Sequence, residues 1–432
     1  MVSRNLKVNT IAREDWFPGL KTGILSSLKT LPAIIYLLFV TLFLSAQTAP
    51  GLLDPEGPEH PAKFPPEIVS RAAVLMDAET GTVLYAKNPD EPIPPASLTK
   101  LMTIHIALNE IDAGRSSPDE IISLPQESWA VNQPPRSSLM YLAEGHIVSL
   151  RELLLGLAIP SGNDAAVAVA LRFSPTVQEF VDRMNAEARR MGLKETRFVE
   201  PSGIDENNMT TAMEFTALCR EYIKRHPDSL RDFHSVMELA YPRTANVAPE
   251  LRSTVATWRQ RNHNPLLTSF EGTDGLKTGY IDESGYNIAL TAERQGTRFV
   301  AVLLGARTAR LRDADGQKLL SWAFENFKTL RPDFGVIEPV RLWKGKAKFA
   351  ELTIDEAPEF TVPVDRGDKL WLSTEIIDPL IAPVPDRFQV GNLILSDAQG
   401  ELRRIPLLTA REYEKGNFFK RIWDSLRLFF RK

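Results

Sequence analysis

This sequence has a single cysteine, a small net charge and only one long apolar run, and each of these features excludes some structures or functions. Cys219 is the single cysteine among 432 residues, so no internal disulfide can form, and its helical surroundings predict a small core residue. The formal net charge of −4 gives no reason to expect nucleic-acid binding. The six histidines show no metal-ligand spacing such as H-E-x-x-H, so we expect neither a metal nor a cofactor. There is no internal repeat and no extended low-complexity segment.

The one long apolar run lies near the N-terminus, over residues 31–46 (LPAIIYLLFVTLFLSA). A basic segment precedes it and the small residues Ser45 and Ala46 end it, which is typical of an export signal. The basic lead is longer than usual, so we interpret residues 1–49 as an export signal or an uncleaved signal anchor. The proline-rich residues 50–66 are expected to form an extended linker.

Residues 67–331 have the pattern of an α+β domain. The stretch AAVLMDAETGTVLYAKN alternates and turns at residues 79–81, which predicts a β-hairpin. A helical block follows over residues 97–225. Its helix starts carry a Ser or Thr followed three residues later by Glu: Ser149 with Glu152, Thr176 with Glu179 and Thr211 with Glu214. Three strand patterns over residues 274–306, separated by tight turns, predict antiparallel pairing, and a helix is expected at about 313–327.

The C-terminal part of the chain differs in pattern from the rest. Short strand patterns separated by Gly, Pro and Asp predict a small all-β domain over residues 332–412. Residues 413–432 form a basic, aromatic tail. On a helix its apolar side chains share one broad face: Phe419, Ile422, Trp423, Leu426, Phe429 and Phe430. The tail is too short and too charged to span a bilayer, and its cations favour an anionic membrane surface, contacted through residues 415–432, over docking on the protein's own core.

Three short motifs occur in order along the chain: SLTK at residues 97–100, SGN at 161–163 and KTG at 277–279. Each alone is weak, and the three together carry the interpretation. Ser97 and Lys100 are three residues apart and so lie on one side of a helix, where the amine can approach the hydroxyl. A lysine can take a serine proton only if its pKa is lowered by burial or by a neighbouring cation, for which Lys277 is the candidate.

The SGN segment follows one apolar helix and precedes another. Asn163 or Asp164 at this position would make an ordinary helix cap, which does not require Ser161. Beside a Ser–Lys pair, Ser161 is interpreted as a proton relay to a leaving group. Asn163 would then hold either Lys100 or a substrate carbonyl.

The KTG segment lies on a predicted strand before a hairpin. A peptide substrate can pair with such a strand as an added strand. Lys277 and Thr278 would then bind a carboxylate, and Gly279 would leave room for the close approach of the peptide.

Taken together, the motifs match the S-x-x-K, S-x-N and K-T-G set of penicillin-binding proteins and serine β-lactamases. The segments PASLTKLMT, SSLMYL, SGNDAAVA, DGLKTGY and GYNIAL resemble the D-alanyl-D-alanine carboxypeptidases, the low-molecular-mass penicillin-binding proteins. The resemblance runs from about residue 72 to the last residues. It implies an α+β, penicillin-binding/β-lactamase-like transpeptidase domain, an antiparallel sheet with a helical block, followed by a small all-β domain and a C-terminal amphipathic helix.

The resemblance also implies a serine acyl-enzyme mechanism on a peptidoglycan stem peptide that ends in D-Ala-D-Ala. Ser97 would attack the carbonyl between the two D-alanines, Lys100 would take its proton, and Ser161 would pass a proton to the departing D-alanine. The backbone N–H groups of Ser97 and Tyr280 would form the oxyanion hole. β-Lactam antibiotics are expected to acylate Ser97. With the export signal and the tail, this implies a periplasmic enzyme attached to the outer face of the inner membrane.

Some positions depart from the family pattern or leave it open. The family holds the terminal carboxylate with an arginine, which aligns here with Arg312, although Arg307 and Arg310 are nearby. Tyr280 stands where the family often has a histidine. Glu200 lies in the loop where class A β-lactamases carry a deacylating glutamate. We interpret it as a loop carboxylate, and its position keeps a β-lactamase open as a second function. A D,D-endopeptidase of the same fold and a non-catalytic, membrane-associated penicillin-binding scaffold also stay open.

Overall fold

The computed structural model describes residues 7–11, 64–253, 255–355 and 358–431. By its internal contacts the chain divides into two compact units, Leu53–Thr329 and Met1–Leu52 with Leu330–Lys432. The predicted export segment at 31–46 and most of the predicted linker lie outside the described residues. Each unit has its own hydrophobic core.

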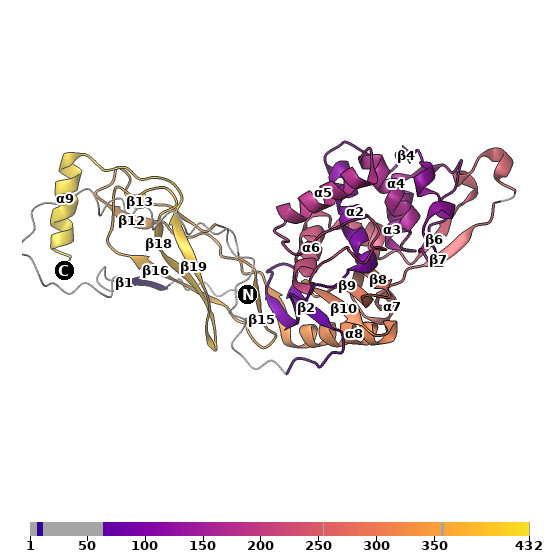
Figure 1. Ribbon diagram of the computed structural model, residues 1–432. Coiled ribbons are helices and arrows are strands. Elements are labelled where there is room, and N and C mark those ends of the chain that lie inside the picture. Colours follow the sequence, from indigo (N-terminus) through magenta and orange to yellow (C-terminus); the bar gives the residue numbers. More distant parts are fainter. Residues whose placement is uncertain (1–6, 12–63, 254, 356–357, 432) are drawn as a thin grey trace, which may run out of the picture. The chain divides into compact units, whose positions relative to one another are not determined.

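A five-stranded antiparallel sheet lies at the centre of the larger unit (Figure 1). Its order is β3-β2-β10-β9-β8, and its strands are β2 (Ala72–Asp77), β3 (Val83–Lys87), β8 (Thr273–Ile281), β9 (Gly285–Arg294) and β10 (Thr297–Ala306). The predicted hairpin and strand trio are confirmed. Gly81 adopts φ 78° in the β2–β3 turn, a conformation that favours glycine. Strand β8, which carries the KTG motif, is an edge of this sheet.

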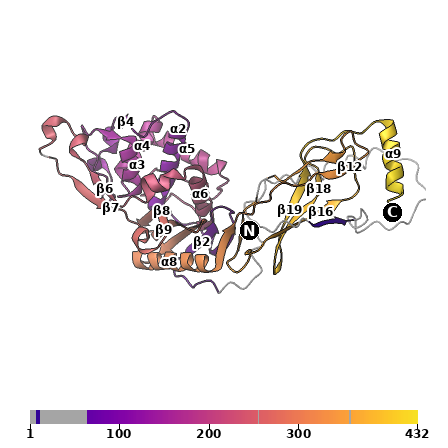
Figure 2. The ribbon, with the colours of Figure 1, turned by 180° about the vertical axis from the view of Figure 1, so that it is seen from behind.

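Helices cover both faces of the sheet (Figures 1 and 2). The helices are α2 (Lys100–Asp112), α3 (Leu150–Ala158), α4 (Asn163–Phe173), α5 (Val177–Arg190), α6 (Ala212–Arg225), α7 (Leu266–Ser269) and α8 (Ala309–Asn326). Successive side chains of a strand point to opposite faces. Accordingly, Val300 and Val302 of β10 belong to the core of the helical block, whereas Phe299 and Ala301 pack in the core that α8 covers.

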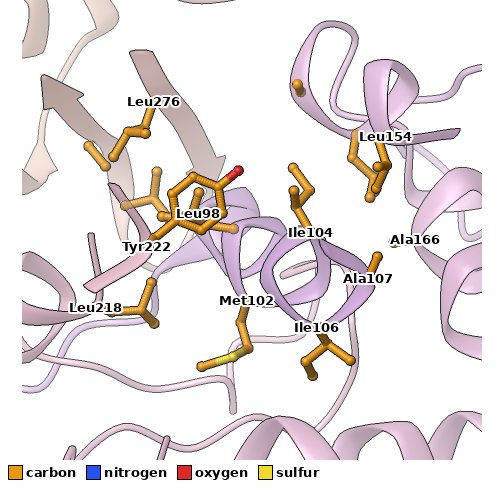
Figure 3. Close-up of a cluster of buried hydrophobic side chains, with 14 of the residues drawn as sticks. Leu98, Met102, Ile104, Ile106, Ala107, Leu154, Ala166, Leu218, Tyr222 and Leu276 are labelled. Atoms are coloured by element: carbon orange, nitrogen blue, oxygen red, sulfur yellow. The ribbon is translucent and has the colours of Figure 1, made fainter. Parts of the chain in front are cut away.

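Helix α2 runs through the middle of the helical block. Its side chains are buried almost all the way round, from Lys100 to Leu108. Figure 3 shows Met102, Ile104 and Ile106 of this helix among apolar side chains from its neighbours α3, α4 and α6. Burying one such side chain stabilises the fold by about 1.5–3 kcal/mol, so the first turn of α2 is held firmly in place.

The predicted helix starts agree with the structure at α3, α5 and α6. Ser149 and Glu152 form a full capping box, and Thr176 and Thr211 accept from the backbone N–H of Glu179 and Glu214. The predicted start of α8 at about residue 313 was wrong. The helix begins at Ala309, because Thr308 caps it by accepting from the N–H of Leu311.

An excursion between α6 and β8 was not predicted. It holds η4 (Leu230–His234), β6 (Glu238–Tyr241), η5 (Thr244–Asn246), η6 (Pro249–Leu251) and β7 (Trp258–Arg261). Strands β6 and β7 pair in antiparallel fashion, with Tyr241 opposite Trp258. Four further short elements lie between α2 and α3: β4 (Ile121–Ile122), η2 (Gln126–Ser128), η3 (Ala130–Asn132) and β5 (Val148–Ser149).

The smaller unit is built on a second sheet, as the prediction of a small all-β domain required. The sheet order is β1-β16-β18-β19-β14, from β1 (Lys7–Ile11), β14 (Leu352–Thr353), β16 (Trp371–Ile377), β18 (Gln389–Asp397) and β19 (Gly400–Thr409). The other strands of this unit are β12 (Val340–Trp343), β13 (Phe349–Ala350), β15 (Phe360–Pro363) and β17 (Leu380–Ile381). Strand β11 (Phe327–Leu330) lies where the chain passes from the larger unit to the smaller one.

The chain ends in helix α9 (Phe418–Phe429), which Asn417 caps. Its apolar side chains are exposed, with Phe419 81% and Trp423 57% accessible. The buried side chain of this helix is Asp424, which accepts a hydrogen bond from the N–H of Lys344 at 2.7 Å. The helix therefore meets the smaller unit through its polar side. Within the part of the chain that the structure describes, no helix is both long and apolar enough to cross a membrane.

Candidate active site

Ser97 and Lys100 lie at the N-terminal end of α2, where the sequence places them. Ser97 is in a short 3-10 turn, η1 (Ala96–Thr99), and Lys100 is the first residue of α2. The Lys100 side chain is fully buried. Its Nζ donates to Ser97 Oγ at 3.0 Å, to Asn163 Oδ1 at 2.7 Å and to the carbonyl oxygen of Ser202 at 2.6 Å.

This environment suits Lys100 to exchange a proton with Ser97. Burial lowers the pKa of Lys100 to about 7, although Glu200 and Asp164 act in the opposite direction. A charged ammonium has three N–H donors, which match the three acceptors. When Lys100 is neutral, two N–H groups can remain on Asn163 and Ser202, and the lone pair can accept the hydroxyl proton of Ser97. The arrangement can therefore generate a serine nucleophile.

Ser161 lies in the turn between α3 and α4, beside Lys100's partner Asn163. It adopts φ 63°, and its side chain is buried. Among the described residues, its Oγ has no hydrogen-bond partner. A buried hydroxyl without a partner in the protein is costly to keep, so this hydroxyl is available to a further group.

Asn163 holds Lys100, one of the two roles expected from the sequence. Its Oδ1 accepts from Lys100, and its Nδ2 donates to Ser137 Oγ at 3.2 Å. The alternative of an ordinary N-cap at Asn163 or Asp164 is wrong, because the N-cap of α4 is Gly162 and it carries no side-chain cap. The buried carboxylate of Asp164 accepts from the N–H of Ala165 and from backbone N–H groups of another segment.

The KTG motif brings β8 against the nucleophile. A Cβ atom added at Gly279 would lie 2.9 Å from the carbonyl oxygen of Pro95 and 3.0 Å from the N of Ser97. The glycine thus makes room for the Ser97 turn, whereas the sequence led us to expect room for a substrate. The next residue, Tyr280, sends its side chain outward, where its hydroxyl donates to Asp282 at 2.6 Å.

Lys277 and Thr278 are both buried beside this turn. The Nζ of Lys277 donates to the carbonyl oxygen of Thr278 at 3.0 Å. Burial first, and then the charges of Lys100 and Arg312, lower the pKa of Lys277 well below its usual value. Lys277 was the candidate cation for lowering the pKa of Lys100, but burial is the cause that lowers it there.

Arg312 lies on α8 and its charge reaches Lys277. Its side chain is buried and pairs with Asp313, with 2.8 Å between NH2 and Oδ1. The two neighbouring arginines considered from the sequence, Arg307 and Arg310, are exposed. Of the three, Arg312 is the one directed into the unit.

His263 lies within electrostatic reach of the site, which sequence reasoning did not indicate. Desolvation of its ring is the first cause that lowers its pKa to about 4, even though the residue as a whole is exposed. The positive charges of Lys277, Arg312 and Lys100 add to this shift, which places the imidazole near all three. No motif surrounds His263, so its nearness to the site could only come from the folded chain.

Glu200 shapes the loop that faces Lys100. Its carboxylate accepts from Ser202 N–H at 2.7 Å, from Ser202 Oγ at 2.6 Å, from Asn208 Nδ2 at 2.6 Å and from the N–H of Gly203. These bonds hold the Ser202 carbonyl oxygen toward Lys100. The carboxylate is occupied by the loop itself, which differs from a group free to activate water.

Two further expectations concern groups away from this site. Cys219 is fully buried in α6, which confirms it as a core residue, and burial raises the pKa of its thiol. Over the described residues, there is no group of three or more His, Cys, Asp and Glu side chains arranged to hold a metal ion.

The fold and the site define a class of protein: a serine hydrolase in which a serine hydroxyl contacts a buried lysine in an α+β domain. The chain matches the D-alanyl-D-alanine carboxypeptidase family over residues 59–308 and the C-terminal domain of penicillin-binding protein 5 over residues 324–415. It therefore belongs to the D-alanyl-D-alanine carboxypeptidases, the low-molecular-mass penicillin-binding proteins.

Individual relatives extend over most of the chain. The chain is 31% identical over 373 residues to D-alanyl-D-alanine carboxypeptidase DacC and 32% identical over 372 residues to DacD, both of Escherichia coli K12. These matches cover 84% and 83% of this chain, and 89% and 91% of the relatives. The crystal structure of penicillin-binding protein 5 from Haemophilus influenzae is similar with a TM-score of 0.71 and 28% identity, over 82% of this chain and 99% of that chain. The family and the fold class expected from the motifs are confirmed.

Proposed function

We propose that this protein is a serine D-Ala-D-Ala carboxypeptidase that removes the terminal D-alanine from peptidoglycan stem pentapeptides. The observation that carries the proposal is the buried Lys100, whose pKa is lowered to about 7 and whose amine contacts Ser97, Asn163 and Ser202. A lysine with such a pKa is half neutral near pH 7, so it can act as a base under ordinary conditions.

The reaction has two steps. In the first, Ser97 Oγ bonds to the carbonyl carbon between the two D-alanines, Lys100 takes the hydroxyl proton, and the C–N bond breaks. Ser161 passes a proton to the nitrogen of the departing D-alanine. In the second step water attacks the ester carbon, the bond to Ser97 Oγ breaks, and the serine regains its proton. Peptide and water are consumed, and shortened peptide and D-alanine are formed.

Substrate binding uses the edge of the central sheet. The stem peptide adds to β8 as a further strand. In this proposal the N–H groups of Ser97 and Tyr280 form the oxyanion hole, and the support is the close approach of Gly279, the residue before Tyr280, to the Ser97 turn. Lys277, Thr278 and Arg312 bind the terminal carboxylate; the support is that Lys277 and Thr278 directly precede Gly279 beside the Ser97 turn and that the charge of Arg312 reaches Lys277.

β-Lactam antibiotics acylate the same serine in this proposal. The contacts of Glu200 argue against a β-lactamase, since its carboxylate is held by donors of its own loop and is not free to activate water. A non-catalytic scaffold has no need of a buried lysine on a serine hydroxyl.

The test measures both reactions on the full chain in mild detergent. Penicillin and an N-acylated Lys-D-Ala-D-Ala peptide are supplied separately, with Ser97→Ala as the matched control. We expect a long-lived penicilloyl adduct by intact mass and release of free D-alanine, both absent from Ser97→Ala. Rapid turnover of penicillin would instead indicate a β-lactamase, cleavage of cross-linked peptides alone an endopeptidase, and no reaction of the wild type a scaffold.

We further propose that the protein is periplasmic and lies on the outer face of the inner membrane through residues 415–432. The support is α9, whose exposed aromatic and aliphatic side chains form one face: Phe418, Phe419, Ile422, Trp423, Leu426, Phe429 and Phe430. An apolar face beside basic residues is the pattern of a helix that lies in a membrane interface.

This attachment is tested on vesicles containing anionic lipid. Deletion of residues 415–432, or the double substitution Phe419→Ser with Phe430→Ser, should release the enzyme from vesicles once the N-terminal segment is removed. Phe349→Ser serves as the control, because Phe349 is also exposed but lies on β13. Continued sedimentation of the deletion variant with vesicles would refute the proposal.

A further inference from the structure

The larger unit has a cavity next to Tyr141, in the segment that bonds to Asp164 just after the SGN turn. Its volume is about 390 Å³, and its walls come from the segment before α3 and from the β6–β7 excursion. They include the aromatic rings of Tyr141 and Trp258, the apolar Val247, and two polar side chains, Glu144 and His146. This volume lies at the small end of ligand pockets, which are typically apolar and aromatic with a few polar groups.

The aromatic rings form an exposed platform. Tyr141 and Trp258 stack with their centroids 5.1 Å apart and their planes at 26°. Trp258 is 52% and Tyr141 38% accessible, so each ring covers the other only in part and both remain open to solvent. Large aromatic side chains that stay this exposed mark sites where something else packs.

Tyr141 is held in place by the catalytic turn. The buried carboxylate of Asp164 accepts from the N–H groups on both sides of it, Met140 at 2.8 Å and Leu142 at 3.0 Å. Between these bonds Tyr141 adopts φ 71°, a conformation that is costly for a bulky residue and is typically kept at functional positions. Asp164 directly follows Asn163, so the segment that carries Tyr141 is bonded to the residue next to the Lys100 partner.

The two polar side chains of the lining, His146 and Glu144, offer a ligand one hydrogen-bond donor and one acceptor. His146 Nδ1 accepts a hydrogen bond from the N–H of Ala143 at 3.3 Å and one from the hydroxyl of Tyr241 at 2.9 Å. The ring proton therefore lies on Nε2. Burial lowers the pKa of His146, which keeps the ring neutral. Glu144 is exposed and offers carboxylate oxygens.

We infer that this pocket binds a pyranose ring of the glycan strand to which the stem peptide is attached. A sugar ring has an apolar C–H face that stacks on an aromatic platform and a rim of hydroxyls that pairs with a donor and an acceptor. The lining contains neither Lys nor Arg, so it offers no cationic partner for a peptide carboxylate. This inference rests on the proposed function and names its substrate more closely: the sugar-linked stem peptide in preference to the bare peptide.

The test compares two substrates with the same peptide. One is the bare stem pentapeptide, and the other is the N-acetylglucosaminyl-N-acetylmuramyl pentapeptide. We expect a lower KM for the sugar-linked substrate in the wild type. Trp258→Ala should raise that KM by about threefold to tenfold, the size of one aromatic stacking contact, with kcat and the constants for the bare peptide unchanged. Phe349→Ala, which removes an aromatic ring of similar exposure on β13, is the matched control.

The outcomes separate this inference from the proposed function. Equal KM values for the two substrates in the wild type, or an equal effect of Trp258→Ala on both, would overturn the glycan site while leaving the carboxypeptidase intact. Failure to release D-alanine from either substrate would refute the proposed function instead. The rate of penicillin acylation shows whether Trp258→Ala still folds, and titration with the peptide-free disaccharide measures pocket binding without any reaction.

Discussion

Acylation of Ser97 should follow the titration of Lys100. Only the neutral amine can accept the serine proton, so the rate should rise with pH as Lys100 loses its own proton. Burial lowers the pKa of Lys100 to about 7. The neutral fraction is then about one-tenth at pH 6 and about nine-tenths at pH 8, so the second-order rate constant for penicillin acylation should rise about tenfold between them and level off above pH 8.

A substitution at Glu200 tests the electrostatic part of this reasoning. Its negative charge stabilises the ammonium form and so raises the pKa of Lys100. Glu200→Gln removes the charge, so the midpoint of the pH profile should move to lower pH. The exposed Glu206 lies in the same loop, and Glu206→Gln should leave the midpoint unchanged.

The assay is stopped-flow acylation by a chromogenic β-lactam from pH 5 to pH 10. A rate that keeps rising about tenfold per pH unit without levelling off would mean that Lys100 titrates like an ordinary lysine, which would refute its role as the base. A midpoint that rises in Glu200→Gln would refute the electrostatic argument. Loss of acylation at every pH would instead mean that the loop no longer holds Lys100.

Three further outcomes follow from single contacts. Gly203→Ala should lower thermal stability and acylation together, because Gly203 has φ 86° and an added Cβ would collide with the carbonyl oxygen of Ala96; unchanged melting would contradict this. Asp424→Asn should speed amide hydrogen exchange in α9 by weakening its bond to the N–H of Lys344, with acylation unaffected; equal exchange would contradict this. Arg312→Ala should raise KM for a peptide ending in a free carboxylate by about tenfold to a hundredfold. The KM for the same peptide ending in an amide should hardly change. An equal effect on both peptides would show that Arg312 does not bind the carboxylate.

Local signals in the sequence were enough for much of the fold. Helix starts at Ser149, Thr176 and Thr211 could be predicted because a cap involves residues only three positions apart. The strand trio followed from apolar runs separated by tight turns. The excursion that holds β6 and β7 escaped prediction, since β7 reads Trp-Arg-Gln-Arg and its side chains are mostly exposed. Short polar strands have no apolar alternation to reveal them.

The residues of the candidate site also differ in whether a local sequence signal could reveal them. Ser97, Ser161 and Lys277 could be found because each belongs to a motif with a chemical rationale. The sequence also indicated Glu200 as a loop carboxylate, as its bonds confirm. The contact of Gly279 with the Ser97 turn could not be found, because the two are distant in sequence. His263 and Tyr141 carry no local pattern at all. Their surroundings include residues more than a hundred positions away along the chain: Lys100 for His263 and Trp258 for Tyr141.

The way α9 is attached has a consequence for how it would bind a surface. A free helix of 12 residues is marginal in water, because nucleation costs more than so few hydrogen bonds return. Here Asp424 bonds the helix to Lys344, and Arg431 pairs with Asp378 at 2.7 Å. The helix is therefore ordered before it meets any partner, and none of the binding free energy is spent on folding it. The same segment cut off as a peptide would bind more weakly than it does on the protein.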